Sequence, residues 1–74
     1  MITRGTVFIH DRFIDPGWAP GPGQKYADAP KASMTVTHVT KGLVYYCYTG
    51  FYPTTAAWSM DRKKFEKRFP NSLA

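Results

Sequence analysis

The alternation of apolar and polar residues along this chain predicts a protein built mainly of β-strands. A run of β-favouring Val, Phe and Ile within residues 5–10 predicts a first strand that ends near Asp11. The clearest pattern lies in residues 32–49, where two alternating segments flank a short turn at residues 40–42. We therefore expect a β-hairpin over residues 32–49.

Each strand of this hairpin divides its side chains between two faces. In the first strand, Met34 and Val36 share a face, and the break in alternation at His38 indicates either a β-bulge or a strand that enters a second layer. The second strand has bulky side chains on both faces, with Leu43, Tyr45 and Cys47 on one and Val44, Tyr46 and Tyr48 on the other. One face would fill the interior of a small barrel, while the other would be covered or left exposed as an aromatic platform.

A fourth strand and a closing helix are predicted in the last third of the chain. Residues 54–60 alternate imperfectly and predict the strand. Asp61 is a good N-cap, and Met60 before it forms a hydrophobic staple with Phe65. Phe65 and Phe69 lie four residues apart, so they share one face of an amphipathic helix that would anchor on the sheet.

The first predicted strand and the hairpin are joined by a segment whose composition disfavours regular helix or sheet. Residues 15–30 contain four of the six Pro and three of the six Gly, which remove backbone donors and raise the entropy cost of ordering. We predict a Gly/Pro-rich loop at about residues 11–31. Trp18 and Tyr26 indicate that this loop is partly ordered, because an aromatic side chain tends to pin a loop onto the body of a protein.

Composition limits the chain to one small domain over residues 1–74. A chain of this size buries only about 60% of its unfolded surface, so its twelve aromatic residues must supply the bulk of the core. Cys47 has no second cysteine to pair with, which favours a reducing compartment. Without an apolar run of membrane-spanning length or a secretory signal, we expect a cytoplasmic protein that does not contact a membrane.

The predicted elements resemble the small SH3-like barrels found among short proteins of phages and other mobile elements. The similar segments are Gly5-Thr6-Val7-Phe8, Met34-Thr35-Val36-Thr37, Val44-Tyr45-Tyr46 and Trp58-Ser59-Met60-Asp61. The resemblance implies a partly open barrel of four or five antiparallel strands with a short C-terminal helix. It also implies a binding module that contacts nucleic acid or protein. The loop between the first two strands is long for such a barrel.

Catalytic chemistry has little support in the sequence. His38 and Cys47 could face each other across the hairpin, but no third group would orient them and no oxyanion hole is evident. The sequence has no phosphate-binding loop of the Walker type and no zinc-ligand spacing. We therefore expect a non-catalytic protein without a metal or other cofactor.

Binding to nucleic acid is the first hypothesis, because the chain carries a net charge of +5 and is rich in aromatic residues. Single strands are held by basic grooves with aromatic rings on which bases stack. If the tyrosines are exposed rather than buried, the contact residues would be Lys41, Tyr46, Tyr48, Arg62, Lys63, Lys64, Lys67 and Arg68.

The second hypothesis is an inhibitor or adaptor that binds another protein, including an acidic one. Interfaces concentrate their binding energy in Trp, Tyr and Arg, and the candidates near predicted loops or strand ends are Trp18, Tyr26, Tyr52 and Trp58. Protein binding should depend less on salt than phosphate binding does. The sequence is also compatible with a monomer or a small homo-oligomer.

Overall fold

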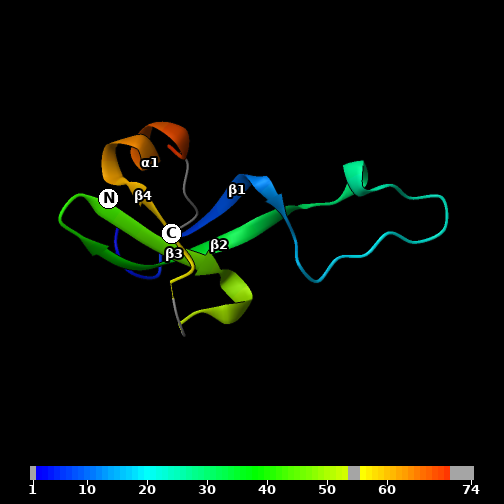
Figure 1. The fold of residues 1–74 in the computed structure, drawn as a ribbon, viewed down its shortest axis with the longest axis horizontal. Coiled ribbons are helices and arrows are strands. Elements are labelled where there is room, and N and C mark those ends of the chain that lie inside the picture. Colours follow the sequence, from blue (N-terminus) through cyan, green and yellow to red (C-terminus); the bar gives the residue numbers. More distant parts are fainter. Residues whose placement is uncertain (1, 54–55, 71–74) are drawn as a thin grey trace.

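A computed structural model of the chain describes residues 2–53 and 56–70. Four strands form one antiparallel sheet in the order β1-β2-β3-β4. The sheet curls into a half-barrel, and the single described α-helix lies over its open side (Figure 1). The elements are β1 (Val7–Ile14), the 3-10 turn η1 (Tyr26–Asp28), β2 (Lys31–Thr40), β3 (Leu43–Tyr48), the 3-10 turn η2 (Thr49–Phe51), β4 (Trp58–Asp61) and α1 (Arg62–Arg68). The predicted small, open, SH3-like barrel with a C-terminal helix is confirmed, with four strands.

The central hairpin forms as the sequence predicts. Lys41 and Gly42 connect β2 to β3, and both have a positive φ, of 42° and 79°. This conformation is that of a two-residue hairpin turn whose twist matches the strands, and glycine adopts it without strain. The pairing register shifts between Val36 and His38, so the predicted bulge in β2 is confirmed.

One face of the curled sheet carries the core. Phe65 from α1 is fully buried and meets Phe8 of β1 edge to face, with ring centroids 4.7 Å apart. Beside this pair, β2 and β3 contribute Ala32, Met34, Val36, Val44 and Tyr46. Of the two faces that alternation predicts, the one with Val44 and Tyr46 is therefore the interior one, and the helix completes the core that the sheet alone leaves open.

The end of β1 differs from the prediction. The strand was expected to end near Asp11 but continues to Ile14, because its last residues pair again with β2 after an irregularity. Ile9 pairs with Ser33 and Ile14 pairs with Lys31, so β1 advances five residues where β2 advances two. Three extra residues must leave the ladder, and we call residues 10–13 the β1 bulge.

The Gly/Pro-rich segment is a long connection between β1 and β2, and it spans residues 15–30 rather than 11–31. At its base, the Asp15 amide donates to the Pro30 carbonyl at 2.9 Å. The segment then projects away from the sheet, drawn in cyan in Figure 1, and gives the molecule a longest dimension of 46 Å. We call it the arm. Trp18 and Tyr26 contact each other within the arm, with centroids 6.0 Å apart, instead of pinning it to the body.

The final strand is shorter than predicted. The prediction covered residues 54–60, of which 54 and 55 lie outside the described residues, and β4 begins at Trp58. Asp61 is the N-cap of α1, as predicted, because its carboxylate accepts from the amides of Lys63 and Lys64. Phe65 and Phe69 turn toward the sheet with their rings 5.2 Å apart, so the exposed side of α1 is left to charged residues.

Candidate functional site

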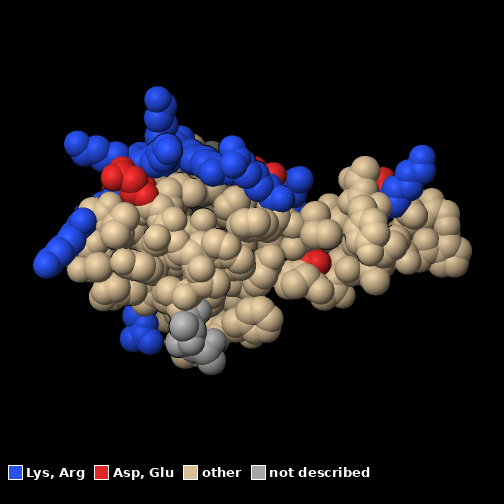
Figure 2. All heavy atoms as spheres, in the orientation of Figure 1, with Lys and Arg blue, Asp and Glu red and all other residues tan. Residues whose placement is uncertain are grey.

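Positive charge is concentrated on the side of the molecule where α1 lies (Figure 2). Six of the ten Lys and Arg of the chain belong to α1 or the β1 bulge. We call this surface the basic face, and its cations are Arg12, Arg62, Lys63, Lys64, Lys67 and Arg68. The arm, in contrast, carries one Lys and two Asp and is nearly neutral.

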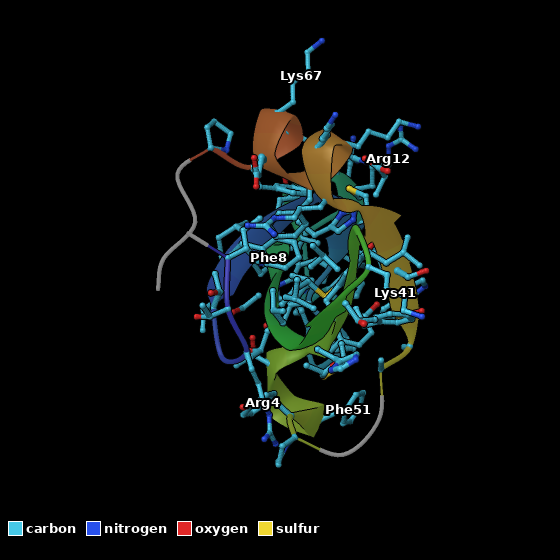
Figure 3. The ribbon with its side chains drawn as sticks, turned by 90° about the vertical axis from the view of Figure 1, so that its left-hand side faces the viewer. Arg4, Phe8, Arg12, Lys41, Phe51 and Lys67 are labelled. Carbon is cyan, nitrogen blue, oxygen red and sulfur yellow. The ribbon has the colours of Figure 1, made fainter. Side chains whose placement is uncertain are left out.

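The helix places its charges outward because of its apolar spacing. Phe65 and Phe69 fix the buried side, so the residues between and before them face solvent. Lys63 and Lys67 are one turn apart and lie on the same outer row, with Lys64 beside them. Figure 3 shows Lys67 projecting away from the body.

The β1 bulge brings Arg12 to the same surface. In a regular strand, neighbouring residues point to opposite faces, but here both Asp11 and Arg12 are exposed while His10 turns inward. Figure 3 places Arg12 beside the helix. Arg12 was not among the predicted contact residues, because no local pattern marks the bulge that redirects it.

An ion pair joins the bulge to the end of the helix. The guanidinium of Arg68 donates from Nη2 to Oδ1 of Asp11 and from Nε to Oδ2 at 3.3 Å. This hydrogen bond lowers the pKa of the Asp11 carboxyl and raises that of the Arg68 guanidinium, so both groups stay charged. Arg68 also lies over the ring of Phe69, 5.3 Å from its centroid. Arg68 is therefore held in a defined place on the basic face.

The carboxylates near the basic face are already engaged. Asp11 holds Arg68, Glu66 accepts from Arg62 at 3.1 Å, and Asp61 caps the helix. Within residues 2–53 and 56–70, four cations of the face have no carboxylate within ion-pair distance, namely Arg12, Lys63, Lys64 and Lys67. These four charges are available to an external anion.

A shallow groove of about 510 Å³ runs between the bulge and the helix. Arg12, Lys64 and Arg68 bring cations to its walls, and Ser59 adds a hydroxyl. Asp61 brings a carboxylate to the same walls, where it accepts from the amides of Lys63 and Lys64. The groove can therefore receive an oxyanion such as a phosphate beside its two unpaired cations, Arg12 and Lys64.

His10 supports this surface from beneath. The residue is only 2% exposed, and its Nδ1 accepts from the Arg12 amide at 3.0 Å, which fixes the backbone of the bulge. Burial and the nearby Arg68 charge lower the pKa of His10 below its ordinary value. The ring packs against Phe13 and Phe69, at centroid distances of 4.4 and 5.4 Å. His10 is thus a neutral core residue that lies beneath the basic face.

The predicted tyrosine platform is not formed. Tyr46 is 4% exposed and packs between Phe8 and Trp58, so the prediction that it offers a ring to a base is wrong. Burial raises the pKa of its hydroxyl. Tyr48 is half-buried and lies edge to face against Trp58, 5.1 Å between centroids. The curl of the sheet turns this face inward, which alternation alone could not decide.

Lys41 is exposed in the turn between β2 and β3, and that turn touches the start of α1 through the Arg62 amide, which donates to the Gly42 carbonyl at 2.8 Å. Of the eight residues predicted to contact nucleic acid, the structure thus gathers Arg62, Lys63, Lys64, Lys67 and Arg68 on one surface. Lys41 lies in a turn that contacts the start of the helix, Tyr46 lies in the core, and Tyr48 packs against Phe51 and Trp58.

The four aromatics predicted for a protein interface do not form one patch. Trp18 and Tyr26 share the arm, whereas Trp58 packs in the core against Phe13, with centroids 5.1 Å apart. Tyr52 lies elsewhere, with the Arg4 guanidinium 5.9 Å from its ring centroid. Tyr26 is the ring most open to solvent, at 66% exposure.

Side chains that could support chemistry are kept apart. His38 pairs with Tyr45 and is exposed, while Cys47 pairs with Thr35 and is buried, so they form no couple. Burial raises the pKa of the Cys47 thiol, which makes it a poor nucleophile. In the part of the chain that the structure describes, no three metal-ligating side chains gather, and no helix combines the length and apolar character needed to cross a bilayer.

Comparisons with known proteins give no relative for this chain. No protein-family model, no curated protein and no solved structure matched it.

Proposed function

We propose that this protein binds nucleic acid through the basic face. The observation that carries the proposal is the set of four cations without a carboxylate partner, Arg12, Lys63, Lys64 and Lys67, gathered on one surface of the described structure. A field of this kind attracts a polyanion from a distance and gains affinity by releasing the counterions of each phosphate it neutralises.

The framework beneath the charges supports this proposal. The helix is fixed by the fully buried Phe65, and the bulge is tied to the helix by Asp11 and Arg68. Charges on a fixed framework lose less conformational freedom on binding than charges on a mobile tail. The groove lined by Arg12, Lys64 and Arg68 is where one phosphate would bind.

The test is a titration of fluorescently labelled nucleic acid with the pure protein at about 50 and 200 mM salt. Four phosphate contacts on B-form DNA predict a slope of log K against log salt of about −3.6, or about a 100-fold loss of affinity over this range. The double substitution Lys63→Glu/Lys64→Glu should abolish binding. Both side chains are exposed, so the fold should survive the exchange.

Two cations outside the basic face offer a matched control. Arg4→Glu/Lys25→Glu changes the net charge by the same amount, also at exposed positions. Figure 3 places Arg4 at the opposite end of the body from Lys67, and Lys25 lies on the arm. This variant should keep most of the affinity. Equal losses in the two variants would mean that net charge alone drives binding, and no binding at low salt would reject the proposal.

A second candidate function, binding of a protein partner, rests on the arm. The arm is nearly neutral, is ordered by its own turns, and carries the Trp18–Tyr26 ring pair. Where it leaves the body, a groove of about 440 Å³ lies between Pro16 on the arm and Tyr48 and Phe51 on the body. Trp18→Ala should weaken capture of such a partner without changing nucleic-acid binding. If Trp18→Ala leaves capture of the partner unchanged, or lowers nucleic-acid affinity instead, this candidate function is rejected.

A further inference from the structure

We propose that the basic face is built for the phosphate backbone of a double helix and discriminates against single strands. This inference rests on the proposed function and narrows it to one class of ligand. The protein would contact the two phosphate rows of a duplex from outside and would not hold unpaired bases. The argument depends on where the aromatic rings lie relative to the charges.

Single-strand binding needs rings whose faces are open beside the cations. Beneath the basic face, the rings of Phe8, Tyr46 and Phe65 are all buried and pack on one another at 4.7 to 5.4 Å. A base could reach them only by opening the core. They support the helix and are closed to stacking.

The ring nearest the surface is covered by the protein's own charge. Phe69 is half-buried, it packs on Phe8 at 4.7 Å, and the guanidinium of Arg68 lies over it. Asp11 holds that guanidinium in place. A nucleotide would have to displace a charged group from both the carboxylate and the ring before it could stack there.

The rings that are exposed lie away from the charges. Phe51 is 58% exposed, and Figure 3 places it at the opposite end of the body from Lys67 and Arg12. Tyr26 lies on the arm. Among the described residues, the remaining large exposed apolar side chains are Ile9 and Leu43, which are aliphatic. The two most exposed rings of the described chain thus lie away from the basic face.

The charges themselves form an area rather than a line. Lys63 and Lys67 follow the outer row of α1, and Arg12 lies across the groove on a different element. B-form DNA presents phosphates on two strands that face each other across a groove, with one negative charge per about 1.7 Å of axis. Cations spread over two elements can meet phosphates of both strands, whereas a single strand offers one row.

The experiment compares a labelled 20-base-pair duplex with each of its separated strands, as DNA and as RNA, at about 100 mM salt. We expect the duplex to bind at least about tenfold more tightly than either strand. The DNA and RNA duplexes both carry two phosphate rows, so the tighter binder of the two shows which helical form the basic face fits better. Circular dichroism of each variant verifies that the fold is retained.

The outcomes separate the two proposals. Single strands that bind as tightly as the duplex, or more tightly, would overturn this inference and leave nucleic-acid binding intact. No binding of any form would reject the proposed function and this inference with it. In Arg12→Ala and in Lys67→Ala, the slope of log K against log salt for duplex binding should be shallower by about one phosphate contact.

Ring variants give an independent test. Tyr26→Ala and Phe51→Ala should change duplex affinity by less than about twofold. Stacking of a base is worth at least about 1 kcal/mol, which corresponds to about fivefold in affinity. A loss of fivefold or more in either variant would show that an exposed ring takes part and would overturn the inference.

Discussion

Arg68 at the end of α1 is paired with Asp11 in the β1 bulge, and 57 positions of sequence separate the two residues. The pair joins the first strand to the last helix and sets the place of Arg12 relative to the lysines of α1. The pair also neutralises one cation of the basic face with one carboxylate. The strength of the ion pair therefore affects both where the cations of the basic face lie and how many of them remain unpaired.

Removing this carboxylate should increase affinity for nucleic acid. Asp11→Asn deletes a negative charge from the basic face and frees the Arg68 guanidinium for a phosphate. We expect tighter binding and a salt slope steeper by about one contact. Asp15→Asn removes the same charge from the base of the arm and is the matched control. A weaker binder would mean that the position of Arg68 matters more than its charge.

Acidification should destabilise the protein through His10. Its pKa in the folded protein lies below the ordinary 6.5, so the unfolded chain takes up the proton first. The stabilising contribution is complete above pH 6.5 and is lost as the pH falls through the folded pKa. Urea unfolding between pH 7.5 and 4.5 measures this loss. His10→Gln, which retains an acceptor but does not titrate in this range, should show a flatter dependence than the wild type.

The helix anchor should be essential for folding. Phe65 is fully buried, and its replacement by Ala costs about 3 to 5 kcal/mol. A domain of this size rarely has more than about 3 to 5 kcal/mol in total. Phe65→Ala should therefore be largely unfolded in thermal melts, whereas Phe65→Leu should lose about 1 to 2 kcal/mol. Lys67→Ala, exposed on the same helix, should stay within about 0.5 kcal/mol of the wild type. A folded Phe65→Ala protein would contradict this account of the core.

The N-cap contributes a smaller and separable amount. Asp61 accepts from the amides of Lys63 and Lys64 at 3.0 and 3.3 Å. Asp61→Ala should cost about 1 kcal/mol of unfolding free energy, and Asp61→Asn, which keeps the capping oxygen, should cost only a few tenths. Denaturant unfolding of the three proteins checks the difference. Equal losses in both variants would indicate that the charge matters more than the cap.

The turn between β2 and β3 offers a stabilising change. Lys41 has a φ of 42°, which costs most residues energy and which Asn tolerates well before Gly42. Lys41→Asn should raise the unfolding free energy by a few tenths of a kcal/mol, and Gly42→Ala should lower it by about 1 to 2 kcal/mol. Thermal melts of both variants measure these opposite shifts. A neutral Gly42→Ala change would show that the turn relaxes to another type.

Local patterns in the sequence predicted much of the fold. The hairpin over β2 and β3, the bulge after Val36 and the cap at Asp61 were all foreseen. Each depends on neighbours within a few residues, through alternation, turn chemistry or a hydrogen bond to the next amides. The cationic side of α1 was foreseen for the same reason, because the spacing of Phe65 and Phe69 fixes the outward residues.

The sequence by itself thus determined the strands, the turn, the helix and its charged side, while the tertiary structure decided what those parts present to a ligand. Alternation gave two bulky faces on β3, and only the curl of the sheet buried Tyr46. Three extra residues in β1 exposed Arg12 and brought Asp11 to Arg68. Such outcomes depend on packing between elements far apart in the chain, which no pattern within a few residues contains.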